Sequence, residues 1–147
     1  MYTKKVKDHF QNPRNFGKIK DADSIGEVGN MACGDVMKLY LKIKKSDKGD
    51  EIIFDIKFET FGCAAAIATS SKITEMAKGK TLTEVLQIDD KAIIESLNGL
   101  PQIKVHCSVL AAKALSEAIY NYYKKNNVEI TESLEKKHQL IVNNKEK

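Results

Sequence analysis

Three cysteines are the residues of this sequence best able to do chemistry. Cys33, Cys63 and Cys107 are too far apart along the chain to form a local C-x-x-C motif or zinc-finger pair. Each lies where one expected structural element gives way to another. A thiol at the start of a helix meets unpaired backbone N–H groups and the positive end of the helix dipole, and both favour the thiolate. Because thiolates bind soft metals and attack sulfur, the placement predicts metal or sulfur chemistry.

Two further side chains with ligand capacity stand beside these cysteines, namely Asp35 and His106. Three thiolates with a carboxylate or an imidazole would satisfy the four-ligand demand of zinc, and they would also hold a [2Fe-2S] cluster. The oxygen of Asp35 is a hard ligand that binds ferrous iron early and releases it more readily than a thiolate does. A mixed ligand set of this kind favours the construction and transfer of a cluster over its storage.

The same residues fit other functions, and a single cysteine often serves as a small buried hydrophobe. The chain could be a zinc-stabilised interaction module, which would unfold on chelation. It could also be an enzyme that uses Cys107 as nucleophile and His106 as base. Adjacent helix residues point about 100° apart, which argues against a direct contact between these two side chains.

The middle of the chain predicts a β-hairpin with one buried face. Alternation of apolar and polar residues before and after the turn KSDKGD is typical of half-buried strands. A weaker Gly-spaced strand is expected over residues 24–30. The predicted inward positions are Met37, Leu39, Leu41 and Ile43 on one strand and Ile52, Phe54, Ile56 and Phe58 on the other.

Helices are predicted at both ends of this strand region. Thr3 can cap a short helix whose Val6 and Phe10 share a face, and a longer helix is expected over about residues 63–78. Residues 81–84 form a capping-box pattern, and Asp89 or Asp90 can cap a helix that ends at Asn98-Gly99. The last long helix begins near Val105, with a predicted apolar stripe of Val105, Val109, Ala112, Leu115, Ile119 and Tyr122.

Strands followed by helices indicate an α+β fold, a small antiparallel three-stranded sheet with helices packed on one face. Residues 1–126 are predicted to form one domain. Residues 127–147 are predicted to be a polar C-terminal extension, partly helical or frayed, to which we assign no function.

Composition excludes several classes of partner and location. The net charge of +4 comes almost wholly from scattered lysines, because Arg14 is the only arginine, so we expect no nucleic-acid partner. No apolar stretch approaches the roughly 18 residues that a membrane span requires, and the N-terminus lacks the apolar segment of a secretion signal. With an odd number of cysteines, which we expect to be reduced, the chain is expected to be cytoplasmic.

Four ordered blocks resemble a known family, the U-type iron-sulfur cluster assembly scaffolds represented by IscU and the N-terminal domain of NifU. They are YTKKVKDHFQNPRNFG, ACGDVMKLYLKI, FETFGCAAAIATSS and LPQIKVHCSVLAAKAL, and they span about residues 2–125. The resemblance implies a scaffold, without turnover of its own, that receives sulfur from a cysteine desulfurase and iron from a donor and passes a cluster to apo iron-sulfur proteins.

The resemblance also implies roles for individual residues. Cys33, Cys63 and Cys107 look like cluster ligands, Asp35 and His106 look like supplementary metal ligands, and Cys107 looks like the principal persulfide acceptor, a role that needs a mobile, exposed thiolate. Zinc in the same site would be similar to what the family shows without a cluster. Tyr2 matches an N-terminal tyrosine that the family places near scaffold contacts.

One block departs from the family pattern. The family often has Leu-Pro-Pro-Val-Lys before the histidine, a segment gripped by a dedicated Hsp70-type chaperone, whereas this chain has Gln102 in LPQIK. This difference argues against the chaperone as a partner. The short spacing between Cys63 and Cys107 places the chain with the IscU and NifU side of the family and not with the zinc-dependent Suf-associated branch.

Overall fold

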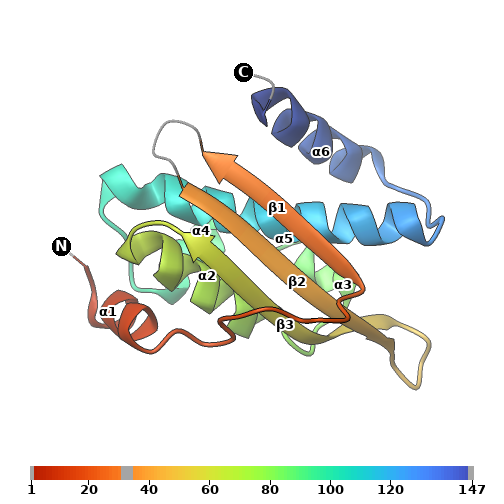
Figure 1. The fold of residues 1–147 in the computed structure, drawn as a ribbon, viewed down its shortest axis with the longest axis horizontal. Helices are drawn as coiled ribbons and strands as arrows, with labels where there is room; N and C mark the ends of the chain where they lie inside the picture. The colour runs from red at the N-terminus through yellow and green to blue at the C-terminus, as the bar shows by residue number, and fades with distance from the viewer. Residues whose placement is uncertain (1, 31–34, 146–147) are drawn as a thin grey trace.

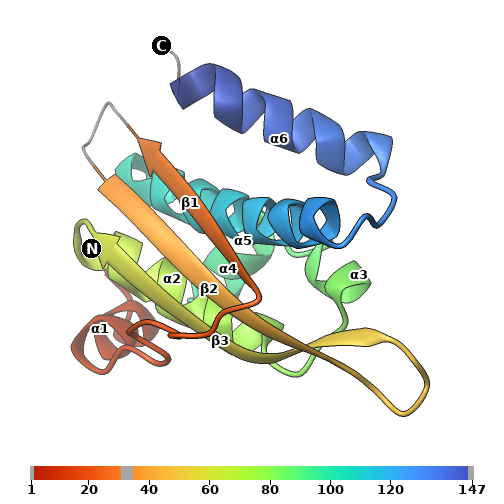
Figure 2. The same ribbon diagram turned by 45° about the vertical axis from the view of Figure 1, so that its right-hand side comes forward.

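The computed structural model describes residues 2–30 and 35–145, in which helices cover one face of a three-stranded sheet (Figures 1 and 2). Cys33 lies outside the described residues, and Asp35 is described through its backbone alone. The antiparallel strand order β1-β2-β3 confirms the predicted α+β class. The elements in chain order are α1 (Lys4–Gln11), β1 (Ser24–Asn30), β2 (Asp35–Lys45), β3 (Glu51–Phe61), α2 (Ala64–Ala77), α3 (Leu82–Val85), α4 (Asp90–Ser96), the 3-10 helix η1 (Gln102–Lys104), α5 (Val105–Lys125) and α6 (Glu132–Lys145).

The inward face of β3 follows the predicted alternation over only part of its length. Ile56 and Phe58 are fully buried as expected. Nearer the turn, however, Ile53 is the buried residue, Phe54 is 50% exposed and Ile52 is only partly buried. The prediction that Ile52 and Phe54 face inward is therefore wrong.

A β-bulge explains this change of face. Lys42 and Ile43 are consecutive in β2, but their partners in β3 are Asp55 and Ile53, so Phe54 is an extra residue in the ladder. One extra residue reverses which side chains face the core, because side chains alternate with a period of two. A bulge of this kind leaves no signal in the apolar pattern, since both faces carry large hydrophobic residues here.

Helix α1 begins at the predicted cap but buries a different face. The Thr3 hydroxyl accepts a hydrogen bond from the backbone N–H of Val6 at 3.2 Å. Val6 is fully buried, whereas Phe10 is 43% exposed and His9 occupies the second buried position. The expectation that Val6 and Phe10 share the buried face is therefore wrong, because a histidine three residues along takes the apolar partner's place.

His9 links α1 to α2 through a defined hydrogen-bond network. Its Nδ1 lies 2.7 Å from the Ser71 hydroxyl, and its Nε2 lies 3.1 Å from a Glu75 carboxylate oxygen. Because the Glu75 carboxylate can only accept, the neutral ring carries its proton on Nε2. Nδ1 then accepts from the Ser71 hydroxyl, whose oxygen accepts from the Arg14 backbone N–H. Burial, with a smaller contribution from Arg14, lowers the pKa of His9 below its ordinary 6.5.

We therefore expect the stability of the fold to decrease at acid pH because of His9. The lowered pKa means that the unfolded chain binds the proton more readily, so this contribution is complete above pH 6.5 and is lost as the pH falls from there through the folded-state value. Urea unfolding at several pH values between 7.5 and 5 measures how steeply the free energy of unfolding changes with pH. His9→Gln, which can hydrogen-bond but cannot titrate, should flatten this dependence, and an unchanged slope in that variant would contradict the assignment.

The predicted starts of three middle helices are confirmed. Cys63 is the N-cap residue of α2, Thr81 and Glu84 form both halves of a capping box, and the Asp89 carboxylate accepts from the N–H of Ala92. The starts at Thr81 and Asp89 were readable because side-chain capping depends on short-range hydrogen bonds alone, whereas the Cys63 side chain makes no such bond.

Helix α5 is the central helix and buries a wider face than the predicted stripe. Leu115 and Ile119 are buried as expected. The other four members of the stripe are only partly buried, namely Val105, Val109, Ala112 and Tyr122. The buried face instead includes small residues such as Ala114 and Ala118, which pack directly against β1. Small residues are weak signals of a buried face, so the stripe was centred on the larger side chains.

The C-terminal segment forms α6, which packs on α5. Leu134 and Ile141 are buried in the main core, and the His138 ring stacks on Tyr120 with centroids 3.7 Å apart. His138 Nδ1 lies 2.9 Å from the nearly buried carboxylate of Glu117. The domain boundary after residue 126 stays a prediction. Within the described part of the chain, no helix is both long and apolar enough to cross a membrane.

Candidate metal centre

Cys63 lies at the turn between β3 and α2. Its backbone is extended, with φ −75° and ψ 176°, and its side chain makes no capping hydrogen bond to the helix. The sulfur is therefore available for other contacts at the N-terminal end of α2. Ala65 and Ala66, in the first turn of α2, are buried and carry little bulk, so they let a second element approach closely.

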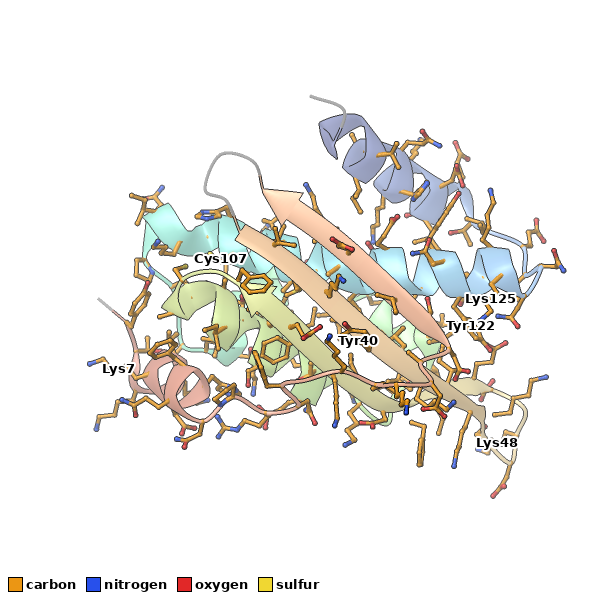
Figure 3. All side chains as sticks on the ribbon, viewed as in Figure 1. Lys7, Tyr40, Lys48, Cys107, Tyr122 and Lys125 are labelled. Atoms are coloured by element: carbon orange, nitrogen blue, oxygen red, sulfur yellow. The ribbon has the colours of Figure 1, made fainter. Side chains whose placement is uncertain are left out.

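That second element is α5, which brings Cys107 to Cys63. Cys107, labelled in Figure 3, lies in the first turn of α5. It is 1% exposed and packs against Ala65 and Ala66. The two Sγ atoms are 3.6 Å apart. The Thr69 hydroxyl of α2 also donates to the Cys107 carbonyl at 3.3 Å, which ties the two helix ends together. Two of the three predicted cysteines are thus brought together from positions distant in sequence.

His106 contacts the same sulfur. Its Nδ1 lies 3.1 Å from the Ile103 carbonyl oxygen, which can only accept, so Nδ1 carries the hydrogen and Nε2 keeps its lone pair. Nε2 lies 3.5 Å from Cys107 Sγ. The expectation that two adjacent helix residues do not touch is therefore wrong, because both stand in the first turn, where the long imidazole side chain folds back over its neighbour.

A lysine that the sequence reasoning passed over also faces the thiols. The negative charge of the Cys63 thiolate is the main factor that raises the pKa of Lys104 above 10.5, while the phenolate of Tyr2 and the thiolate of Cys107 add to it. The signal in the sequence was its position, two residues before His106. An ammonium group beside two sulfurs offsets their negative charge when both are ionised.

The described residues show part of the predicted ligand set. Cys63, His106 and Cys107 are linked by two contacts that both pass through Cys107 Sγ. Among residues 2–30 and 35–145, no three His, Cys, Asp or Glu side chains are placed to hold one ion. This statement does not extend to Cys33 or to the side chain of Asp35, which the structure does not describe.

The sheet register places the backbone of Asp35 near the N-terminal end of α2. Asn30 pairs with Asp35, and Val36 pairs with Phe61, the last residue of β3. Phe61 is two residues from Cys63. Asn30 and Asp35 therefore lie at the end of the sheet from which the chain continues into α2.

An aromatic and an aliphatic side chain pack against the cluster that buries Cys107. Tyr2 and Leu100 pack against the small cluster that contains Cys107. Removing the Tyr2 ring should therefore expose that sulfur. We expect Tyr2→Ala to increase the rate of iodoacetamide alkylation of Cys107 by about severalfold, measured by peptide mass spectrometry. Lys4→Ala, an exposed change in the same segment, is the control; equal rates in both variants would show that Tyr2 does not cover the site.

The fold and site together define a class: a small α+β domain that presents cysteine thiols at the starts of two helices. The model of the family described as NifU-like N terminal domain matches residues 1–129, and the chain belongs to this family. The resemblance inferred from the four sequence blocks is thereby confirmed.

Curated relatives share most of the chain. The "Iron-sulfur cluster assembly scaffold protein IscU 1" of Archaeoglobus fulgidus is 62% identical over 126 residues, which cover 86% of this chain and 79% of that protein. The "Iron-sulfur cluster assembly scaffold protein IscU" of Buchnera aphidicola subsp. Schizaphis graminum is 48% identical over 129 residues, 86% of this chain and 97% of the other.

Solved structures share the fold. An iron-sulfur cluster assembly scaffold protein for the SUF system from Fervidobacterium islandicum matches with a TM-score of 0.65 at 29% identity, over 80% of this chain and 96% of that one. The N-terminal part of a nitrogen-fixing NifU-like protein from Brucella abortus matches with a TM-score of 0.63 over 84% and 94% of the two chains. At 20% identity, the second likeness concerns the fold alone.

Proposed function

We propose that this chain is a scaffold on which a [2Fe-2S] cluster is assembled and from which it is transferred to apo iron-sulfur proteins. The observation that carries the proposal is the 3.6 Å separation of Cys63 and Cys107 Sγ in a chain whose relatives are named as cluster scaffolds. Both sulfurs can contact one small cluster because cluster iron is held by cysteine thiolates. Iron and sulfur are the cargo, and the chain has no independent turnover.

The ligand set that we propose is Cys33, Cys63 and Cys107, with Asp35 and His106 as supplementary ligands. His106 suits this role because its Nε2 lone pair already points to the sulfur of Cys107. The ammonium of Lys104 offsets part of the negative charge of the thiolates. Zinc can occupy the same ligands when no cluster is present, since it accepts sulfur, nitrogen and oxygen donors.

A cysteine desulfurase is the sulfur donor in this proposal, and Cys107 is the principal acceptor of the persulfide. The expectation of an exposed thiolate at Cys107 is wrong for this structure, because the residue packs against Ala65 and Ala66 and is 1% exposed. Delivery of sulfur therefore requires Tyr2 and Leu100, which pack against the same cluster, to move aside. Gln102 in LPQIK argues against a dedicated Hsp70-type chaperone. The thiol chemistry fits the reducing conditions of the cytoplasm.

A transfer experiment tests the proposal. The chain is incubated anaerobically with a cysteine desulfurase, cysteine, ferrous iron and a reductant, then separated and mixed with an apo-ferredoxin. We expect a visible-absorbing cluster on the chain and its subsequent appearance on the ferredoxin. A cluster that forms but never leaves would contradict the scaffold function.

Asp35 offers a sharper test of cluster release. A carboxylate oxygen holds iron less firmly than a thiolate does, so we propose that it speeds departure of the cluster. Asp35→Ala is expected to slow transfer by about tenfold, which corresponds to roughly 1.4 kcal/mol in the activation barrier. Stopped-flow or circular dichroism kinetics with the apo-ferredoxin measure the rate, with Asp47→Ala in the exposed turn between β2 and β3 as the control. Equal rates for Asp35→Ala and the wild type would contradict this role.

The contact between His106 and Cys107 favours one alternative, an enzyme with a cysteine nucleophile. An imidazole nitrogen 3.5 Å from a sulfur could take its proton. Against it stands the burial of Cys107 among apolar groups. Saturable, thiol-dependent turnover in metal-free protein would support the enzyme, and its absence together with cluster transfer would support the scaffold.

A further inference from the structure

The contact between Cys63 and Cys107 brings together two groups that can exchange electrons. Their Sγ atoms are 3.6 Å apart, and a disulfide needs about 2.05 Å, so closure requires a movement of only about 1.5 Å. Cys63 lies at the turn from β3 to α2 and its side chain caps no backbone group, so a rotation of this side chain breaks no capping hydrogen bond. The pair is therefore placed for thiol-disulfide chemistry as well as for ligation.

Cluster assembly poses a redox problem at this position. A persulfide carries sulfane sulfur, whereas a cluster contains sulfide, so each delivered sulfur atom must gain two electrons. A thiolate beside a persulfide can supply them by displacing hydrosulfide from the inner sulfur. The nearest thiol to Cys107 Sγ among the described residues is that of Cys63.

We propose that Cys63 is the resolving thiol for a persulfide on Cys107, an inference that rests on the proposed scaffold function. The Cys63 thiolate attacks Cys107 Sγ, the bond between that atom and the outer sulfur breaks, and hydrosulfide leaves with the electron pair. The outer sulfur is reduced to sulfide, and the two cysteine sulfurs are oxidised to a disulfide. An external dithiol then reduces the disulfide and restores both thiols.

The surroundings favour this direction of attack. Cys107 is packed in an apolar cluster, whereas Cys63 is partly exposed and faces the ammonium of Lys104. Attack on the outer sulfur would only move the persulfide from one cysteine to the other, without reduction, so the products distinguish the two reactions.

The test uses the whole 147-residue chain, free of metal and under anaerobic conditions, with cysteine persulfide as the sulfur donor and no other reductant. Intact and peptide mass spectrometry follow the sulfur, and a colorimetric assay follows the released sulfide. We expect the wild type to gain one sulfur on Cys107, then to release about one sulfide per chain and form a Cys63–Cys107 disulfide. In Cys63→Ser, the persulfide should persist and sulfide release should slow by at least about tenfold.

Cys63→Ser suits this test because serine is a preferred N-cap residue, so α2 keeps its start. Cys33→Ser removes the remaining thiol and should leave the disulfide step in place. Sulfide release that stops in Cys33→Ser but continues in Cys63→Ser would overturn the inference, as would a persulfide that persists in the wild type or moves to Cys63.

A parallel sample separates this inference from the proposed function. Wild-type protein is given ferrous iron and inorganic sulfide, which bypass the persulfide. If a cluster forms there while the Cys107 persulfide persists in the first assay, the resolving role fails and the scaffold function stands. If sulfide is released with disulfide formation but no cluster forms from iron and sulfide, the scaffold function fails instead.

Discussion

Cys107→Ser is expected to abolish cluster formation on this chain. The substitution replaces a soft thiolate, 3.6 Å from Cys63 Sγ and 3.5 Å from His106 Nε2, with a hydroxyl that stays protonated and binds iron weakly. We expect the visible absorbance of the reconstituted cluster to fall at least about tenfold. Anaerobic reconstitution with iron and inorganic sulfide, followed by absorption and circular dichroism spectra, measures the loss.

A neighbouring substitution controls for damage to the helix. Ser108 is buried in the same turn of α5, where its hydroxyl donates to the Val105 carbonyl at 2.7 Å. Ser108→Ala removes a buried oxygen without touching a proposed ligand, so it should reconstitute at close to the wild-type level. If Cys107→Ser formed a normal cluster, Cys107 would not be a ligand.

Gly26→Ala is expected to destabilise the fold strongly, because the added methyl group has no space between β1 and α5. A Cβ at this position of β1 would overlap the Ala114 carbonyl oxygen and lie 2.6 Å from the Ala118 backbone nitrogen of α5. Both contacts are with backbone, so relief requires the sheet and the central helix to separate. We expect a loss of about 3 kcal/mol in the free energy of unfolding, measured by urea denaturation.

The cause of this loss is steric and not conformational. Gly26 is not among the residues with positive φ, so alanine can adopt its backbone angles. The control is Glu27→Ala, whose side chain is exposed on the same strand, and it should change stability by no more than about 0.5 kcal/mol. Equal effects of the two substitutions would show that β1 does not pack tightly on α5.

The order and type of the elements could be predicted from the sequence because they depend on local signals. Thr3, Thr81 and Asp89 cap helices through hydrogen bonds within a single turn. The alternation along β2 is strong enough to place Met37 and Leu39 in the core. These features need no knowledge of the rest of the fold.

Features that depend on packing between elements could not be predicted. The bulge at Phe54 is set by how β3 bends across β2. Burial of His9 depends on Ser71 and Glu75, which are distant in sequence and give no periodic signal. The polar composition of the C-terminal segment likewise gave no indication that Leu134 docks α6 against the main core.

At the candidate site too, features set by local sequence could be predicted, and features set by packing between elements could not. Placement at the starts of helices made Cys63 and Cys107 recognisable in the sequence, and both occupy such positions. Their mutual contact arises because α2 and α5 pack together at these ends, which a single sequence does not specify. The contact of His106 with Cys107 was missed because an average helical angle ignores the length and rotamer of the imidazole side chain.

Iron and acid-labile sulfide analysis of anaerobically purified and reconstituted protein tests most directly whether these distant sulfurs share one cluster. We predict equal amounts of iron and sulfide, both bound to the wild type and both lost from the Cys63→Ser and Cys107→Ser variants. Wild-type protein that retains neither element after reconstitution, or variants that retain both in full, would contradict the account.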